Sequence, residues 1–381
     1  MQYRTFPRIP GVPVSVLGFG CMRLPVLGGD MKQIDEGPAQ GLLRQAIDAG
    51  VNYVDTAYPY HGGQSEPFVG RALKDGYRAK VQLATKLPVW LVNAESDWER
   101  LLDEQLKKLD TDHIDFYLLH ALSADRWETV LRHRGLAAME RALADGRIRH
   151  LGFSVHDSLG VFKTIIDGYD WAFCQIQYNF IDQQYQAGTE GLRYAAARRI
   201  GVIVMEPLRG GTLAVPQPDA IQRVWDRSPE RRAPADWALR WVWDHPEVVT
   251  ALSGMNAAGQ VLENLASAGE ARAGGLDAGA LALVEEVRAI YADRMRVGCT
   301  TCGYCAPCPS GVAIPETFAS YNTGAMFETW KAAAWQYQTF FAGQGHGADQ
   351  CQECGACEPK CPQGIPIMAR LKEAHAALTQ C

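Results

Sequence analysis

The sequence predicts an α/β protein in which a (β/α)8 TIM barrel is followed by a smaller, mainly helical domain. A short apolar strand and an amphipathic helix alternate about every 30 residues as far as residue 270. Polar residues recur where these strands end, which is where such barrels carry their chemistry. A group of cysteines then sets the last part of the chain apart from the barrel.

Eight apolar segments are expected to form the strands of the barrel. They have the length and the β-branched or aromatic content of buried strands. Amphipathic helices separate them, and parallel strands joined by helical crossovers, repeated eight times, close into a barrel. The expected strands are Val14–Gly20, Val51–Asp55, Val81–Lys86, Ile114–His120, His150–Ser154, Trp171–Tyr178, Gly201–Pro207 and Val248–Ser253.

A doubly wound open sheet is the alternative fold. Such a sheet carries a glycine-rich dinucleotide fingerprint between an early strand and its helix. Gly18 and Gly20 lack the third glycine and the helix that should follow at once, so the sequence favours the barrel. The barrel is expected over residues 1–270, a helical linker over 271–298 and the cysteine-rich domain over 299–381.

Composition argues against several classes of protein. The 381 residues carry a net charge of −6, which is unfavourable for a nucleic-acid-binding protein. No apolar run reaches membrane-spanning length and no signal peptide is evident, so we expect a cytoplasmic protein with no membrane partner. Of the 11 cysteines, eight lie between Cys299 and Cys361, and such a group in a cytoplasmic protein indicates metal binding.

Polar side chains at the ends of the expected strands should meet at one end of the barrel. Each alone would suggest a structural role, but several strands converging on one face describe a site. These residues are Asp55, Lys86, His120, Ser154, Gln175, Glu206 and Ser253.

Tyr60, just after the strand that ends at Asp55, is expected to be a proton donor. Its phenol has a reference pKa of about 10, which a neighbouring Lys86 ammonium would lower by favouring phenolate. Asp55 would hold Lys86 in place, and His120 would hydrogen-bond the substrate oxygen. An acid without an activated Ser or Cys nucleophile suits hydride delivery to a carbonyl carbon.

Three motifs resemble those of the aldo-keto reductase superfamily, which has DTAxxY, ATK and LLH at its second, third and fourth strands. Here they are Asp55-Thr56-Ala57-Tyr58-Pro59-Tyr60, Ala84-Thr85-Lys86 and Leu118-Leu119-His120, and the resemblance extends over residues 12–268. It implies a catalytic tetrad of Asp55, Tyr60, Lys86 and His120, with Tyr60 as general acid. It also implies NAD or NADP bound across the barrel mouth without a Rossmann fold.

The same resemblance implies a set of cofactor contacts. Ser154 and Gln175 match the positions that bind the nicotinamide carboxamide. The loop with Gly210 and Gly211 matches the pyrophosphate site, where glycines let backbone N–H groups approach phosphate. In chain order the matching residues are Ser154, Gln175, Met205, Pro207, Leu208, Gly210, Gly211, Asn256, Gln260, Glu263 and Asn264.

Other positions in this set concern the adenine half of the cofactor and two departures from the family pattern. Glu263 and Asn264 match positions near the adenine, and Asn256 is expected to begin a helix whose N-terminus favours phosphate. Met205 stands where many members stack a Tyr on the nicotinamide. Gln260 stands where an Arg commonly binds the 2′-phosphate, which leaves NAD versus NADP open.

Two cysteine motifs follow the expected linker, each with three cysteines at two-residue gaps and a fourth before proline. The second matches the bacterial ferredoxin pattern, in which the fourth cysteine binds the other of two clusters; the first is one residue shorter. We therefore expect two [4Fe–4S] clusters. One would be bound by Cys299, Cys302, Cys305 and Cys361, and the other by Cys351, Cys354, Cys357 and Cys308.

Two alternatives remain for this domain. A pair of structural zinc sites would also use eight thiolates, and a single cluster would leave the shortened first motif empty. The intervening Ile314–Phe341 has a helical, aromatic pattern, so the domain resembles a helical ferredoxin module. A barrel fused to such a module resembles a subgroup of aldo-keto reductases with a C-terminal ferredoxin-like 4Fe-4S domain.

Together these observations predict an NAD(P)H-dependent oxidoreductase that interconverts a carbonyl and an alcohol, with clusters that exchange electrons with a partner protein. Hydride moves two electrons and a cluster one, and no flavin motif connects them, so structural clusters are an alternative. Two further readings stay open. In one, a bound nicotinamide makes the net reaction an elimination, hydrolysis or epimerisation; the other is a redox or nucleotide sensor.

Overall fold

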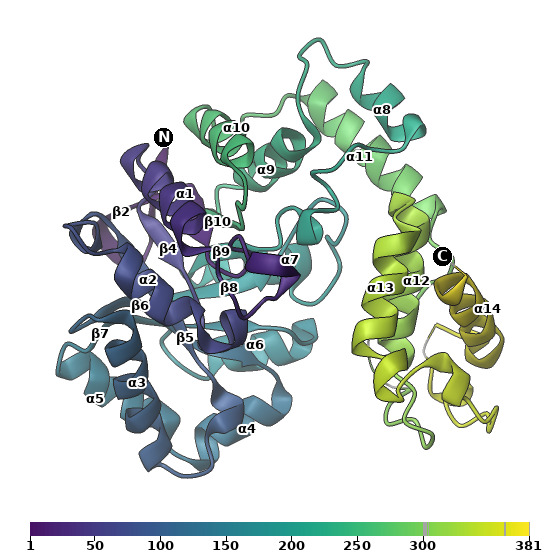
Figure 1. Ribbon diagram of the computed structural model, residues 1–381, viewed down its shortest axis with the longest axis horizontal. Helices are drawn as coiled ribbons and strands as arrows, with labels where there is room; N and C mark the ends of the chain where they lie inside the picture. The colour runs from purple at the N-terminus through teal and green to yellow at the C-terminus, as the bar shows by residue number, and fades with distance from the viewer. Residues whose placement is uncertain (300–302, 304, 362, 381) are drawn as a thin grey trace. The chain divides into compact units, whose positions relative to one another are not determined.

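A computed structural model describes residues 1–299, 303, 305–361 and 363–380 (Figure 1). The predicted ligand Cys302 and the terminal Cys381 lie outside the described residues. The chain divides into two compact units, each described by itself below. Unit 1 comprises Met1–Val215 and Arg232–Asp277, and unit 2 comprises Pro216–Arg231 and Ala278–Cys381.

Unit 1 contains the predicted closed barrel of eight parallel strands. β3 to β9 pair in chain order, and β10 closes the ring between β9 and β3. Helical crossovers connect them, and Figure 1 shows the helices outside the ring. The strands are β3 (Leu17–Gly20), β4 (Tyr53–Asp55), β5 (Gln82–Leu87), β6 (Ile114–Leu122), β7 (Ile148–Val155), β8 (Phe173–Gln177), β9 (Gly201–Met205) and β10 (Val248–Ser253).

The helices of unit 1 bury one apolar side against these strands, as α3 does with Trp98, Leu101 and Leu102. They are α1 (Glu36–Asp48), α2 (Ser65–Ala72), α3 (Ser96–Leu109), α4 (Ala124–Arg132), α5 (Gly135–Ala144), α6 (Leu159–Asp167), α7 (Gly188–Ala197), α9 (Pro234–Asp244) and α10 (Ala258–Gly269).

An antiparallel hairpin of β1 (Tyr3–Phe6) and β2 (Ile9–Ser15) precedes the barrel. The sequence did not predict it, and the strand expected over Val14–Gly20 is in fact split between β2 and β3. The Phe6 ring packs 5.2 Å from Phe116 and 5.8 Å from Phe173. The hairpin therefore covers the barrel interior near the strand beginnings, opposite the ends that carry the polar residues.

Unit 2 combines the cysteine-rich region with two helices from earlier in the chain. They are α11 (Ala278–Asp293), which lies within the expected linker, and α8 (Asp219–Trp225). Arg227 pairs with Glu286, and the Tyr291 hydroxyl donates to Gln217. Residues 216–231, expected within the barrel, thus pack in unit 2 because α11 covers them.

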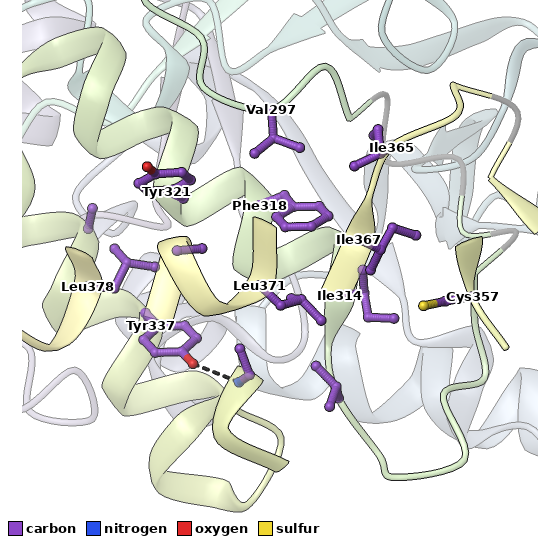
Figure 2. Packing of buried hydrophobic residues seen from close by; sticks show 14 residues of the cluster. Val297, Ile314, Phe318, Tyr321, Tyr337, Cys357, Ile365, Ile367, Leu371 and Leu378 are labelled. Atoms are coloured by element: carbon purple, nitrogen blue, oxygen red, sulfur yellow. Dashed lines mark hydrogen bonds between the residues drawn. The ribbon is translucent and has the colours of Figure 1, made fainter. Parts of the chain in front are cut away.

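The remaining helices of unit 2 are α12 (Ile314–Phe327), α13 (Trp330–Phe340) and α14 (Ile367–Thr379), and they enclose one apolar core. Figure 2 shows Phe318 and Leu371 at its centre and Cys357 at its edge. The Tyr337 hydroxyl accepts a hydrogen bond from the Ala348 backbone N–H at 2.7 Å (Figure 2). Among the described helices, none has both the length and the apolar composition needed to cross a membrane.

Candidate functional site

The centre of the barrel mouth is a buried ion pair between Lys86 of β5 and Asp55 of β4. Lys86 Nζ lies 2.6 Å from Asp55 Oδ1 and donates to the Thr56 backbone oxygen at 2.8 Å. Lys86 is 0% exposed and Asp55 2%. β4 and β5 pair in parallel with Asp55 opposite Ala84, so the two side chains meet because they end neighbouring strands.

Tyr60 is the third member of this group. It begins the short 3-10 turn Tyr60–Gly63 after β4, and its hydroxyl oxygen accepts a hydrogen bond from Lys86 Nζ at 3.3 Å. Because the oxygen accepts from Lys86, the phenol proton can be donated to another acceptor. The structure therefore brings Asp55, Lys86 and Tyr60 together.

Burial dominates the protonation of these three groups. It raises the pKa of Asp55, although Lys86 acts in the opposite direction. Burial alone would lower the pKa of Lys86. The charges and hydrogen bonds of Asp55 and Tyr60 outweigh this effect of burial, so the pKa of Lys86 is raised. Lys86 lowers the Tyr60 pKa as expected, but the expected net shift below the reference value is wrong for this chain. Burial raises the Tyr60 pKa more than the ammonium lowers it, so the phenol is protonated at neutral pH.

His120 lies on β6 beside an irregularity. The pairing of β6 with β7 shifts register between Leu119 and Leu122, and Ala121 has a φ of 50°. The His120 and Tyr60 ring centroids are 6.2 Å apart, and His120 Nδ1 is buried with no hydrogen-bond partner among the described residues. Burial, aided by the charge of Lys86, holds the pKa of His120 well below its usual range. The neutral ring can donate one hydrogen bond and accept another.

The two predicted carboxamide contacts lie on β7 and β8. Ser154 Oγ accepts a hydrogen bond from the Ala121 backbone N–H at 2.7 Å. Gln175 Nε2 lies 3.5 Å from the sulfur of Met205, while Gln175 Oε1 is buried without a partner in the described part of the chain. A buried amide oxygen without a donor is unfavourable, and a carboxamide N–H would satisfy it.

The predicted pyrophosphate loop follows β9. Gly210 and Gly211 have φ values of 67° and 95°, in the region that favours glycine. The Gly210 N–H donates to the Glu206 carboxylate, and the Gly211 N–H donates to the Leu208 oxygen at 2.9 Å. Both N–H groups are thus engaged within the loop, and a phosphate at Gly210 would have to displace Glu206. Arg23, which the sequence analysis missed, lies 3.8 Å from Glu206.

The predicted adenine and 2′-phosphate contacts lie at the start of α10. Asn256 was expected to begin this helix, but the N-cap is the following residue, Ala257. The Asn256 N–H donates to Gln260 Oε1 at 2.9 Å. Gln260 and Glu263 are exposed. Asn264 is buried and donates to Ser253 Oγ at 3.0 Å, which ties α10 to the end of β10.

The cysteines of unit 2 form two groups. Cys299, Cys305 and Cys361 line one cavity, which Ile314 and Phe318 also line. The second group contains Cys357, which is buried in the core. Burial raises the pKa of Cys357, and nearby Cys351 and Cys308 act in the same direction; Cys354 is exposed.

Among the described residues, no three His, Cys, Asp or Glu side chains converge closely enough to hold one metal ion. A zinc ion would require such close convergence, whereas a [4Fe–4S] cluster separates its thiolates on the corners of a cubane. The cavity lined by Cys299, Cys305 and Cys361 therefore fits a cluster better than a zinc ion.

Comparison with known families places both units. A model of the aldo/keto reductase family matches residues 16–272, which is more than half of the chain. The chain belongs to the aldo/keto reductase family. A model of the 4Fe-4S dicluster domain matches residues 297–365 of this aldo/keto reductase. It is therefore an oxidoreductase of this family with a C-terminal 4Fe-4S domain.

Relatives of this aldo/keto reductase include L-galactose dehydrogenase of Arabidopsis thaliana. It is 26% identical over 301 residues, which cover 73% of this chain and 91% of that protein. Methylglyoxal reductase YeaE of Escherichia coli is 34% identical over 140 residues, which cover 35% of this chain and 47% of that protein.

Solved structures with the same fold include the holo form of AKR11C1 from Bacillus halodurans. It is 26% identical, with a TM-score of 0.62, covering 75% of this chain and 96% of that one. An aldo-keto reductase from Klebsiella pneumoniae in complex with NADPH is 25% identical, with a TM-score of 0.61, covering 76% and 96%.

A buried polar network behind Lys86 in this aldo/keto reductase was not predicted. Glu66 of α2 accepts hydrogen bonds from Thr85 at 2.7 Å and from Gln105 of α3 at 2.5 Å. Gln105 also donates to the Lys86 backbone oxygen at 3.0 Å and accepts from the Tyr117 hydroxyl at 2.6 Å. The sequence held one signal of it, because Gln105 is a polar residue within the apolar stripe of its helix.

Proposed function

We propose that this chain is a nicotinamide-dependent oxidoreductase that interconverts a carbonyl group and an alcohol, with Tyr60 as proton donor during reduction. The observation that carries the proposal is the buried contact of Lys86 with both Asp55 and Tyr60. An ammonium beside the phenol oxygen stabilises the phenolate that forms as Tyr60 gives up its proton. The nicotinamide supplies the hydride in this reaction.

The chain's own residues divide the remaining tasks. Asp55 and the Thr56 oxygen fix the Lys86 ammonium, so Lys86 keeps its charge and position beside Tyr60. The neutral His120 ring orients the substrate oxygen toward the Tyr60 proton through a hydrogen bond. No other acid is needed, because Tyr60 is protonated at neutral pH.

A nicotinamide dinucleotide fits the residues at the mouth. The buried Gln175 Oε1 lacks a donor among the residues that the structure describes, and Ser154 lies on the neighbouring strand. Arg23 and the Gly210 N–H flank the Glu206 carboxylate, which occupies an anion position that a phosphate could take. A neighbour from Klebsiella pneumoniae is described in complex with NADPH, which supports NADP(H) as the first cofactor to test.

We also propose two [4Fe–4S] clusters in unit 2, with the ligand sets predicted from the sequence. The cavity lined by Cys299, Cys305 and Cys361 supports the first set, because it joins the first motif to the last cysteine of the second. The second set is supported by Cys351 and Cys308, which lie close enough to Cys357 for their charges to act on it. Such clusters transfer single electrons, and we propose a protein partner as the source or acceptor.

Iron content and spectroscopy test the cluster proposal. Anaerobically purified protein should contain roughly eight iron atoms per chain, and Cys361→Ser should lose about half of them. Iron near four per chain in the unmodified protein would contradict the second cluster. Anaerobic titration with NADPH followed by EPR tests the partner, because a reduced-cluster signal from NADPH alone would make a separate electron donor unnecessary.

Tyr60→Phe tests the catalytic proposal. Removing the hydroxyl should lower kcat for aldehyde reduction by roughly 10²–10⁴-fold, the usual contribution of general acid catalysis, while NADPH still binds. Tyr77→Phe is the matched control, because Tyr77 is a surface residue whose hydroxyl bonds Asp48. Activity of Tyr60→Phe within a few-fold of the unmodified enzyme, with the control unchanged, would contradict the proposal.

A further inference from the structure

Arg126 of α4 places a cation one aromatic ring away from His120. The guanidinium carbon of Arg126 lies 5.1 Å from the centroid of the Trp90 ring, and the Trp90 ring lies 5.2 Å from the ring of His120. Trp90 belongs to the short turn Val89–Leu91 after β5 and is 40% exposed. Trp90 therefore contacts both Arg126 and His120 at the barrel mouth, beside the proposed position of the substrate oxygen.

The Arg126 side chain is held in this position. Its NH1 group donates to the backbone oxygen of Ala121 at 2.6 Å, and Ala121 directly follows His120. The Ala121 N–H is in turn held by Ser154 Oγ at 2.7 Å. A guanidinium has five N–H donors, so the contact with Ala121 leaves others for a ligand.

Arg126 has no ion-pair partner within the described ranges of the chain, in contrast to its neighbour on the same helix. Arg132 of α4 lies 3.6 Å from Glu128. The carboxylate of Asp157, near the start of α4, accepts hydrogen bonds from the N–H groups of Ala124 and Ser158.

Two other acidic residues at the mouth are likewise engaged. Asp182 lies 3.1 Å from Arg209, and Glu206 accepts from Gly210. Arg126 is half-buried, lies next to the proposed catalytic site and has no carboxylate partner in the described part of the chain. Its guanidinium therefore offers a place for an anionic group of a substrate.

The charge of Arg126 also acts at His120. Burial and Lys86 are the larger causes of the lowered pKa of His120, and Arg126 contributes in the same direction. Lys86 and Arg126 thus both place positive charge near the neutral ring. An anionic substrate would be attracted to this end of the barrel.

We propose that the substrate is an aldehyde or ketone that also carries a carboxylate, and that Arg126 binds this carboxylate while Tyr60 and His120 bind the carbonyl oxygen. This inference rests on the proposed carbonyl reduction. The planar guanidinium matches a carboxylate, and the Trp90 ring, which contacts both Arg126 and His120, covers the apolar part of the molecule. The carboxylate and the carbonyl should therefore be separated by a spacer about as long as an aromatic ring.

A pair of aldehydes that differ in charge tests the inference. 4-Carboxybenzaldehyde is an anion at neutral pH, and methyl 4-formylbenzoate is its uncharged ester. The unmodified enzyme should reduce the anion with the higher kcat/KM. Arg126→Gln should lower kcat/KM for the anion roughly ten- to a hundredfold through KM, as expected for a lost charged hydrogen bond, and change the ester by less than about threefold.

Two variants separate charge from structure. Arg126→Lys keeps the charge and should retain much of the preference for the anion. Arg132→Gln removes a positive charge from the same helix at a residue that pairs with Glu128. This variant should leave kcat/KM for both substrates unchanged. If Arg126→Gln lowered kcat/KM equally for both aldehydes, the inference would be overturned. Arg126 would then serve only to support the Ala121 backbone. No preference for the anion in the unmodified enzyme would overturn it as well.

Binding to Tyr60→Phe distinguishes this inference from the proposed function. In that variant the affinity for 4-carboxybenzaldehyde, measured by quenching of tryptophan fluorescence, should fall roughly ten- to a hundredfold when Arg126→Gln is added. If the unmodified enzyme reduces neither aldehyde but binds the anion in this Arg126-dependent way, the proposed function fails, whereas the binding of a carboxylate by Arg126 stands. If both aldehydes are reduced but their binding does not depend on Arg126, the proposed function stands and the inference fails.

Discussion

At the scale of single residues, Lys86 is the group on which the proposed chemistry depends. Its ammonium contacts the Asp55 carboxylate, the Thr56 oxygen and the Tyr60 hydroxyl, all within 3.3 Å. The burial that makes Tyr60 a weak acid also strengthens the electrostatic effect of Lys86, because few water molecules screen it. Lys86 therefore decides how easily the phenol becomes phenolate, although burial sets the overall direction of the pKa shift.

Lys86→Met should lower kcat/KM by roughly 10²–10⁴-fold and move the pH profile. Alcohol oxidation needs the phenolate of Tyr60, so its kcat/KM rises with pH toward a Tyr60 pKa that burial has raised. Lys86 lowers that pKa, so without Lys86 the pKa is higher still and the rise shifts to more alkaline pH. The measurement is kcat/KM for alcohol oxidation across the neutral and alkaline range.

Lys80→Met is the control for this prediction. Lys80 is a surface residue that lies 2.9 Å from Asp48, so its replacement should leave the profile in place. A Lys86→Met enzyme whose alkaline rise stays at the same pH as in the unmodified enzyme would show that Lys86 does not tune Tyr60.

The predicted catalytic residues could be recognised from the sequence because each lies near or just after the end of a strand within a short motif. Asp55, Lys86 and Tyr60 lie together because their strands are neighbours, which the order of the motifs already implied. The direction of the Tyr60 pKa was predicted wrongly, because it depends on a balance between burial and charge that a motif does not contain. Arg126 has no motif, and its relation to the site becomes visible only through its contacts with Trp90 and the Ala121 backbone.

At the scale of elements, helices of unit 2 fix the loops that carry the proposed cluster ligands. Asn322 of α12 shows this most directly. Its Oδ1 accepts hydrogen bonds from the N–H groups of Arg296 and Val297, both at 3.0 Å, and its Nδ2 donates to the Val297 oxygen at 2.7 Å. These bonds fix the segment that leads directly into Cys299.

Asn322→Ala should weaken the cluster proposed on Cys299. The substitution leaves buried backbone groups of the segment without partners, at a cost of about 1–3 kcal/mol each. We expect loss of iron from one cluster, followed as iron content and EPR signal after anaerobic purification. Gln336→Ala on the exposed side of α13 is the control. Full iron content in Asn322→Ala would mean that Cys299 is positioned without this side chain.

Periodicity predicted the eight barrel strands because each is a buried apolar segment between turn residues. The hairpin of β1 and β2 was missed because its sequence does not alternate like that of a strand. The interrupting residues are Pro7, Pro10, Gly11 and Pro13. The two strands form nevertheless, because they pair with each other. The association of α8 with α11 was missed for another reason. Helical periodicity gives the apolar side of α8 but not the helix that covers it.

At the scale of the whole molecule, each unit has a core of its own. The barrel interior is filled by a cluster that includes Phe6, Phe116 and Phe173, and unit 2 is built around Phe318 and Leu371. The proposed cluster ligands belong to the second core, since Cys357 is part of it and the other described ligands except Cys354 pack against it. Cluster binding should therefore stabilise unit 2 directly.

Removal of the clusters by a chelator under oxidising conditions should lower one of two thermal transitions. The transition of unit 2 should fall by roughly 10 °C or more, because loss of a tightly bound group that stabilises a small domain removes several kcal/mol. The barrel transition should stay in place. The measurement is differential scanning calorimetry of the protein with and without clusters, and a joint shift of both transitions would show that the units unfold together.

The path of the chain between the units limits how the two can be separated. It leaves the barrel after Val215, returns at Arg232 and leaves again after Asp277. A truncation that keeps only residues 1–270 would retain α8 but delete α11, exposing Ile221 and Val224 to water. An isolated, soluble reductase should therefore require both an end at Asp277 and a short replacement for residues 216–231, whereas a single protease cut would leave a barrel prone to aggregate.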